Sequence, residues 1–86
     1  MTYHYKTRGT CSTMIDFDLD ENGVIKDVAF TGGCNGNLKG ISSLVRGRKA
    51  DEVIGLLRGT TCGMKQTSCP DQLAQALETA LRSQNA

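Results

Sequence analysis

The chain has 86 residues and a net charge of +1, with 38% hydrophobic and 22% charged residues. These values are typical of one small globular domain spanning residues 1–86, and the near-neutral charge gives no strong signal for binding nucleic acid or an anionic membrane. No apolar run approaches transmembrane length, and the first ten residues, MTYHYKTRGT, lack the apolar core of a signal peptide. We therefore expect a cytoplasmic protein.

The N-terminal half has the two-residue period of β-strands. Thr2–Thr7 alternates around two tyrosines, and Cys11–Leu19 alternates apolar residues with aspartates. Asn22-Gly23 predicts a hairpin turn, because both residue types accept a positive φ. Val24–Phe30 follows as the partner strand. The sequence thus predicts a small antiparallel sheet.

The C-terminal half changes to helical spacing. One helix is predicted from Leu38 to a stop at Gly47, a second before Gly59, and a third over Pro70–Arg82. Strands followed by helices indicate an α+β fold in which about three helices pack on one face of the sheet. The apolar residues expected to face the core are Leu38, Ile41, Leu44 and Val45 in the first helix, Val53, Ile54, Leu56 and Leu57 in the second, and Leu73, Leu77 and Leu81 in the third.

The segment TGGCNGN, Thr31–Asn37, is predicted to form a loop between strand and helix. Its glycines let the backbone turn sharply and approach whatever Cys34 contacts, and the helix that follows directs N–H groups toward an anion, a thiolate or a phosphate. A tight structural turn without a ligand explains the same residues. The candidate contacts here and in the later loop are Gly32, Gly33, Asn35, Gly36, Asn37 and Lys65.

The segment TSCPDQLAQAL places a thiol at a predicted helix entrance. Pro70 suits the first helical position, which puts Cys69 at the N-cap with Ser68 before it. The positive end of the helix dipole stabilises a thiolate at that position. Cys69 is therefore the candidate reactive thiol.

Four cysteines are a high count for a reducing compartment. Three of them, Cys34, Cys62 and Cys69, fall near predicted helix ends, where they could hold zinc or an iron–sulfur cluster with Cys11 as a fourth ligand. Their spacings match no CxxC ribbon or knuckle, so a reactive thiol and plain burial both remain open. The single histidine, His4, is expected on the surface of a strand rather than among the ligands.

The stretches GGCNGNLKGIS, TTCGMKQ and TSCPDQLAQAL resemble the TSCPD domain, which is named for its pentapeptide, over nearly the whole chain. Domains of this kind accompany ribonucleotide reductases, so the resemblance implies a role in nucleotide binding and DNA synthesis, with a ribonucleotide reductase or a nucleotide as partner. The chain has no room for the large reductase barrel, and its last residues, Ser83–Ala86, include no cysteine pair, so we expect an accessory domain rather than an independent enzyme. A homodimer is compatible with this role.

A second resemblance concerns the middle of the chain. The stretch FTGGCNGNLKGISSLVRGRKADEVIGLL is similar to U-type iron–sulfur scaffolds in its order of strand, Gly-Cys loop, Ser-rich helix and Glu-bearing helix. This similarity implies that three cysteines surround zinc or a cluster. The leading hypothesis is therefore an accessory domain with a cysteine metal site, and its competitor is a thiol-dependent oxidoreductase that uses Cys69.

Overall fold

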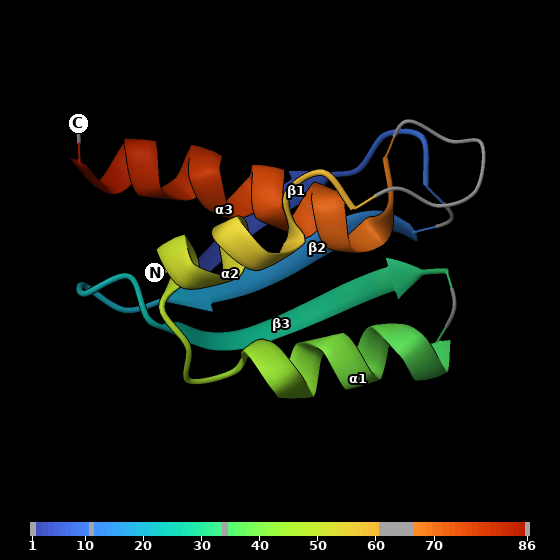
Figure 1. Cartoon of the computed structure of the whole chain (residues 1–86), viewed down its shortest axis with the longest axis horizontal. Helices are drawn as coiled ribbons and strands as arrows, with labels where there is room; N and C mark the ends of the chain where they lie inside the picture. Colours follow the sequence, from blue (N-terminus) through green and yellow to red (C-terminus); the bar gives the residue numbers. More distant parts are fainter. Residues whose placement is uncertain (1, 11, 34, 61–66, 86) are drawn as a thin grey trace.

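The computed structural model of the chain describes residues 2–10, 12–33, 35–60 and 67–85, in which three strands precede three helices (Figure 1). The predicted α+β class is confirmed. The elements are β1 (Thr2–Lys6), β2 (Ser12–Leu19), β3 (Ile25–Gly32), α1 (Asn35–Val45), α2 (Ala50–Leu57) and α3 (Cys69–Asn85).

The three strands form one antiparallel sheet in the order β1-β2-β3. Ile15 and Leu19 on β2 are fully buried, and Phe17 between them is 3% exposed, so the alternating residues face the core as predicted. Tyr3 of β1 lies opposite Phe17, and their rings stack with centroids 5.3 Å apart. The apolar alternation of β2 therefore sets which face of the sheet is covered.

The hairpin between β2 and β3 turns at Gly23, whose φ is +77°. The Asp20 carboxylate accepts hydrogen bonds of 2.9 Å from the backbone N–H groups of Asn22 and Val24. None of the non-glycine residues in the described ranges has a positive φ, so within this turn the left-handed conformation is provided by Gly23 and not by Asn22. The predicted turn is confirmed, with Asp20 as a stabilising residue that the turn signal did not include.

The helices cover one face of the sheet (Figure 1). α3 packs against α2 and β2, while α1 packs against β3. Leu73 and Leu77 of α3 are fully buried, which confirms the predicted stripe of that helix. The opposite face of the sheet carries the aspartates of β2, and none of the described helices covers it. None of the described helices is long and apolar enough to cross a bilayer.

Two expectations about the helices are wrong. Leu44 of α1 and Leu56 of α2 are 70% and 66% exposed instead of facing the core. The buried residues are Leu38, Ser42 and Val45 in α1, and Ala50 and Val53 in α2, so the helical spacing alone overestimates how much of each helix is covered. α1 also begins at Asn35, three residues earlier than predicted, which places Gly36 and Asn37 in its first turn rather than in a loop.

Candidate functional site

The segment Thr67–Asp71 forms the entrance to α3. The Ser68 hydroxyl accepts a hydrogen bond of 3.2 Å from the backbone N–H of Asp71, and the Ser68 carbonyl accepts one of 2.8 Å from Gln72 N–H. Ser68 is therefore the N-cap, and Cys69 is the first helical residue rather than the cap that the sequence predicted. Pro70 follows at the second position, where its missing N–H again costs no helical hydrogen bond.

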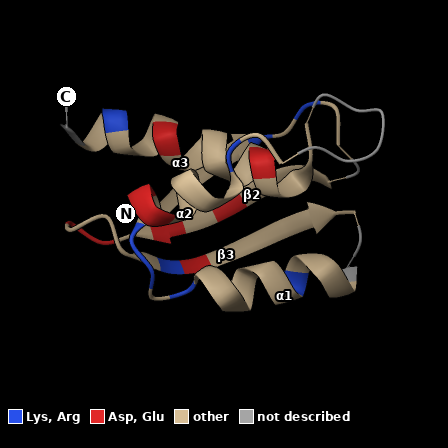
Figure 2. Ribbon diagram, in the orientation of Figure 1, with Lys and Arg blue, Asp and Glu red and all other residues tan. Residues whose placement is uncertain are grey.

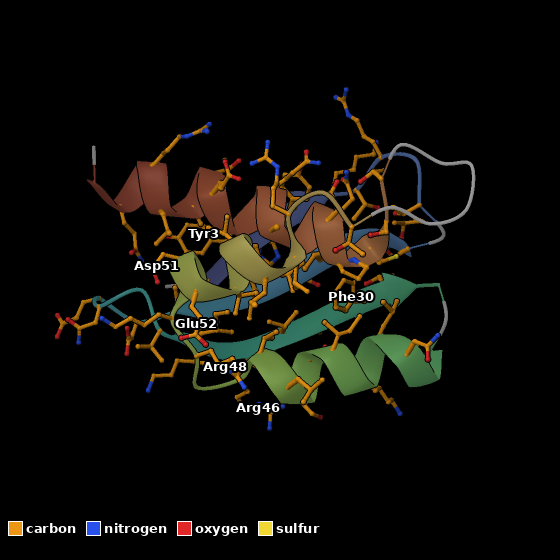
Figure 3. All side chains as sticks on the ribbon, viewed as in Figure 1. Tyr3, Phe30, Arg46, Arg48, Asp51 and Glu52 are labelled. Carbon is orange, nitrogen blue, oxygen red and sulfur yellow. The ribbon has the colours of Figure 1, made fainter. Side chains whose placement is uncertain are left out.

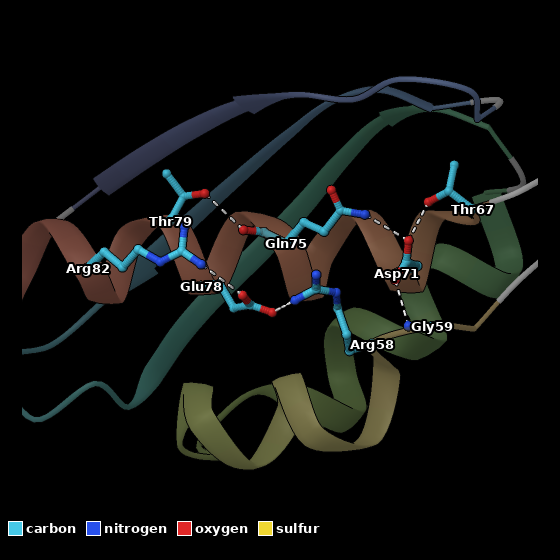
Figure 4. A network of polar contacts seen from close by, with 8 residues as sticks. All are labelled: Arg58, Gly59, Thr67, Asp71, Gln75, Glu78, Thr79 and Arg82. Carbon is cyan, nitrogen blue, oxygen red and sulfur yellow. Dashed lines mark hydrogen bonds and ion pairs between the residues drawn. The ribbon is translucent and has the colours of Figure 1, made fainter.

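Asp71 connects the entrance of α3 to the end of α2. Its buried carboxylate accepts hydrogen bonds from Gly59 N–H at 2.7 Å, the Thr67 hydroxyl at 2.5 Å and the Gln75 amide at 2.8 Å (Figure 4). Burial alone would raise the pKa of Asp71, but these hydrogen bonds and the nearby Arg58 outweigh it and hold the pKa below the ordinary value. The carboxylate is thus charged and fully engaged in holding two helices together.

Ser68 also contacts the residue that precedes positions 61–66. Besides capping α3, its hydroxyl donates a hydrogen bond of 2.5 Å to the carbonyl of Thr60. Thr60 is the last described residue before positions 61–66, and Thr67 is the first one after them. Asp71 and Ser68 therefore hold both described ends of this connection against the start of α3. Cys62 and Lys65, predicted as a ligand and a loop contact, lie outside the described residues.

Cys69 is 7% exposed, and its Sγ lies 3.0 Å from the Oγ of the buried Ser12. Ser12 begins β2 and follows Cys11 directly in the chain. The predicted reactive thiol is therefore a nearly buried group in the first turn of a helix, beside a hydroxyl. The helix dipole favours its thiolate, whereas burial opposes it.

The glycine segment begins next to Ser12, at the end of β3. Ser12 pairs with Gly32 in the register of β2 and β3. Gly32 and Gly33 have φ values of +78° and +81°, so the sharp turn predicted after β3 is present. The chain then enters α1 at Asn35. Cys34, which lies between Gly33 and Asn35, and Cys11 both fall outside the described residues.

The described neighbours of all four cysteines therefore converge at one end of the molecule, which we call the cysteine end. It comprises the start of β2, the end of β3, the starts of α1 and α3, and the two residues flanking positions 61–66 (Figure 1). The sequence could not indicate this proximity, because Ser12 and Cys69 are 57 positions apart. Within the described part of the chain no three His, Cys, Asp or Glu side chains gather, and three of the cysteines lie outside it.

His4 is placed away from this end. Its Nδ1 lies 2.5 Å from a carboxylate oxygen of Asp16, across from it on β2, and its side chain is 68% exposed. Asp16 alternates with the buried Ile15 and Phe17, so the pair occupies the uncovered face of the sheet. This placement agrees with the expectation that His4 is a surface residue.

Sequence reasoning missed the roles of Ser12, Ser68 and Asp71. A signal existed for the last two, since Ser68 and Asp71 are spaced as in a helix capping motif, S-x-x-D, close to the capping box. This pattern marks Ser68 as the N-cap, whereas the proline alone points to Cys69. No local signal marks Ser12, because its partner comes from a distant element.

The described residues form a small α+β module in which Ser68, from the segment TSCPD, caps the last helix, and the residues flanking the undescribed cysteines lie near Cys69 at the cysteine end. A sequence profile of the TSCPD domain matches residues 1–81. The chain belongs to this family, which is associated with ribonucleotide reductase. No curated protein and no solved structure matches the chain.

Proposed function

We propose that this TSCPD domain is an accessory module of ribonucleotide reduction that holds a metal through its cysteines. The proposed ligands are Cys34, Cys62 and Cys69, with Cys11 as a fourth. The observation that carries the proposal is the convergence of the described neighbours of these cysteines at the cysteine end. The family association makes a ribonucleotide reductase or a nucleotide the proposed partner.

The donor set suits zinc or an iron–sulfur cluster, because both prefer thiolates and take up to four of them. Zinc would fix the geometry of this end, and a cluster would in addition carry an electron. Cys69 begins α3, so the N-terminal amides of the helix favour its deprotonated form. The Ser12 hydroxyl, 3.0 Å from this sulfur, is in the position of an outer hydrogen-bond partner that orients a ligand.

The proposal is tested by the metal content of protein purified without chelator under reducing conditions. We expect a stoichiometric metal in the native chain and loss of most of it in single alanine variants of Cys34, Cys62 and Cys69. His4→Ala is the matched control and should keep the metal, because His4 pairs with Asp16 on the uncovered sheet face. Circular dichroism of each variant separates loss of the ligand from loss of the fold.

Ser12→Ala gives a second variant that keeps every cysteine. Loss of an outer-shell partner typically weakens metal binding by about 10-fold or more, so this variant should bind metal more weakly while remaining folded. Retention of metal in all three cysteine variants would remove the metal site.

A thiol-dependent oxidoreductase is the second candidate, favoured by the position of Cys69 in the first turn of α3. It requires a chain without metal in which Cys69 is alkylated faster at neutral pH than Cys11. Mass spectrometry of the alkylated peptides distinguishes the two sites. Fast reaction at Cys69 in metal-free protein would favour this candidate over the metal module.

A further inference from the structure

A cavity of about 320 Å³ lies between β3 and α1. Its lining includes Val28 and Phe30 of β3 and Leu38 of α1. Val28 and Leu38 are buried, whereas Phe30 is only partly buried against the core. We call this cavity the α1 groove. Its volume is at the lower end of the range found for small-molecule sites, and its apolar lining suits a ring or a short aliphatic group.

One side of the α1 groove is basic. Lys39, Ser43 and Arg46 line it. They are spaced i, i+4 and i+7, so they follow one another along the same side of α1 over about 10 Å. Ser43 thus lies about one turn from each cation. The long side chains of Lys39 and Arg46 can both reach a group placed over the Ser43 hydroxyl.

Arg46 and Lys39 differ in the ion pairs that they already form. An Nη atom of Arg46 lies 3.2 Å from a carboxylate oxygen of Asp27, and Figure 3 shows this arginine at the end of α1. A guanidinium has five N–H donors, so Arg46 keeps donors for a ligand while it is paired with Asp27. Lys39 takes part in none of the ion pairs found among the described residues. It is the only charged residue within α1, which carries no acidic residue (Figure 2).

The two serine hydroxyls beside the groove, those of Ser42 and Ser43, differ in whether they are free to donate to a ligand. Ser42 also lines the cavity, but its Oγ donates a hydrogen bond of 2.9 Å to the Leu38 carbonyl within α1. Ser43 has no such helical hydrogen bond among those of the described residues and is exposed. The polar side of the groove therefore offers two cations and one hydroxyl donor. This combination is complementary to a single anionic group.

We propose that the α1 groove binds a small organic anion, in which a phosphate or carboxylate group is carried on an apolar or aromatic body. The anionic group lies over Ser43 between Lys39 and Arg46, and the body packs on Phe30. Charge-assisted hydrogen bonds from the two cations fix the orientation of the ligand. The lining of the groove extends to Gly32, two residues before Cys34, but binding there uses no cysteine side chain and needs no metal.

The test is a titration of the ¹⁵N-labelled full chain followed by amide chemical shifts. Phenyl phosphate and phenylacetate represent the two possible anionic groups, and the tighter of the two identifies the source. We expect shifts confined to residues 28–32 of β3 and to residues 38–46, which comprise most of α1 and Arg46 directly after it. Phenol lacks the charge and inorganic phosphate lacks the body, so each should bind at least about 10-fold more weakly than the better probe.

Variants test the role of each cation. Lys39→Gln and Arg46→Gln should each weaken binding of the better probe by up to about fivefold, as expected when an exposed pair of opposite charges is lost. Arg82→Gln, on the exposed side of α3, is the matched control and should bind as the native chain does. Equal weakening by Arg82→Gln, or shifts scattered over the whole chain, would overturn the proposal. Binding of phenol as tight as that of phenyl phosphate would also overturn it.

Discussion

The Oγ of Ser12 lies 3.0 Å from the Sγ of Cys69, which joins the start of β2 to the start of α3. Both residues are buried, and Ser12 also pairs with Gly32 at the end of β3. One serine thus links the three described segments that lead to or contain Cys11, Cys34 and Cys69. This relationship makes the cysteine end a unit of the fold rather than a set of separate loops.

Removing the helix cap should destabilise the protein. Ser68→Ala deletes the acceptor for Asp71 N–H and the donor to Thr60, so we expect the free energy of unfolding to fall by about 1–2 kcal/mol. Ser83→Ala, at an exposed position near the end of α3, should change it by less than about 0.5 kcal/mol. Urea denaturation of both variants checks this. Equal stability of Ser68→Ala and the native chain would mean that Ser68 is not the cap.

Neutralising Asp71 should have a larger effect. Asp71→Asn keeps the size of the side chain but leaves an amide nitrogen facing donors, and the Gly59 N–H or the Thr67 hydroxyl loses its acceptor. The expected loss is about 2–3 kcal/mol, since hydrogen bonds to a buried charged group are the stronger kind. Asp51→Asn, at an exposed site in the first turn of α2, is the matched control and should lie within about 0.5 kcal/mol of the native chain.

The same carboxylate predicts a pH dependence. Although burial opposes it, the net effect of its partners holds the pKa of Asp71 below the ordinary aspartate value. A group with a lowered pKa in the folded state stabilises the protein above its unfolded pKa, and this stability is lost as the pH falls through the folded pKa. The native chain should therefore lose stability below about pH 4. Asp71→Asn should show a flatter curve over this window.

The comparison with Asp71→Asn is necessary because a second carboxylate, that of Asp20, also has a lowered pKa and so also makes stability fall in acid. The Val24 N–H, together with Asn22 N–H and Lys26, holds the pKa of Asp20 below the ordinary value. The Asp71→Asn variant and the native protein both retain Asp20, so the difference between their denaturation curves reports Asp71 alone. Parallel curves from pH 7 down to pH 2 would contradict the role given to Asp71.

Two glycine substitutions should act in opposite directions. Gly23→Val places a β-branched residue at a φ of +77°, so we expect a loss of about 1–3 kcal/mol. Gly40→Ala lies in α1, where an added Cβ meets no atom within 4 Å, and should gain about 0.5–1 kcal/mol from helix propensity. Thermal melting of both variants measures this. An unchanged melting curve for Gly23→Val would contradict the turn.

The sequence predicted the parts of this fold that depend on local periodicity. The alternation of Ile15, Phe17 and Leu19 identified the buried face of β2, and the spacing of Leu73 and Leu77 identified the buried stripe of α3. The expectation for Leu44 failed because periodicity gives the face of a helix and not the width that its neighbours cover. Burial is a property of the packed layers.

The candidate site was predictable in its residue types but not in its arrangement. The sequence correctly predicts Cys69 at the start of a helix. The position of Pro70 indicates Cys69 as the N-cap, whereas the structure has Ser68, one residue earlier. The pairing of Ser12 with Gly32, and its contact with Cys69, depend on the order of the strands and on how α3 packs over them. Such long-range contacts carry no signature in a local pattern.

The most direct test of the cysteine metal site is to measure metal and thiols together in the native chain purified without chelator. We expect about one zinc ion or one iron–sulfur cluster per chain, with at least three of the four cysteines protected from alkylation. Removal of the metal with a chelator should expose those same thiols. Absence of bound metal, together with alkylation that a chelator does not change, would show that the cysteines hold no metal.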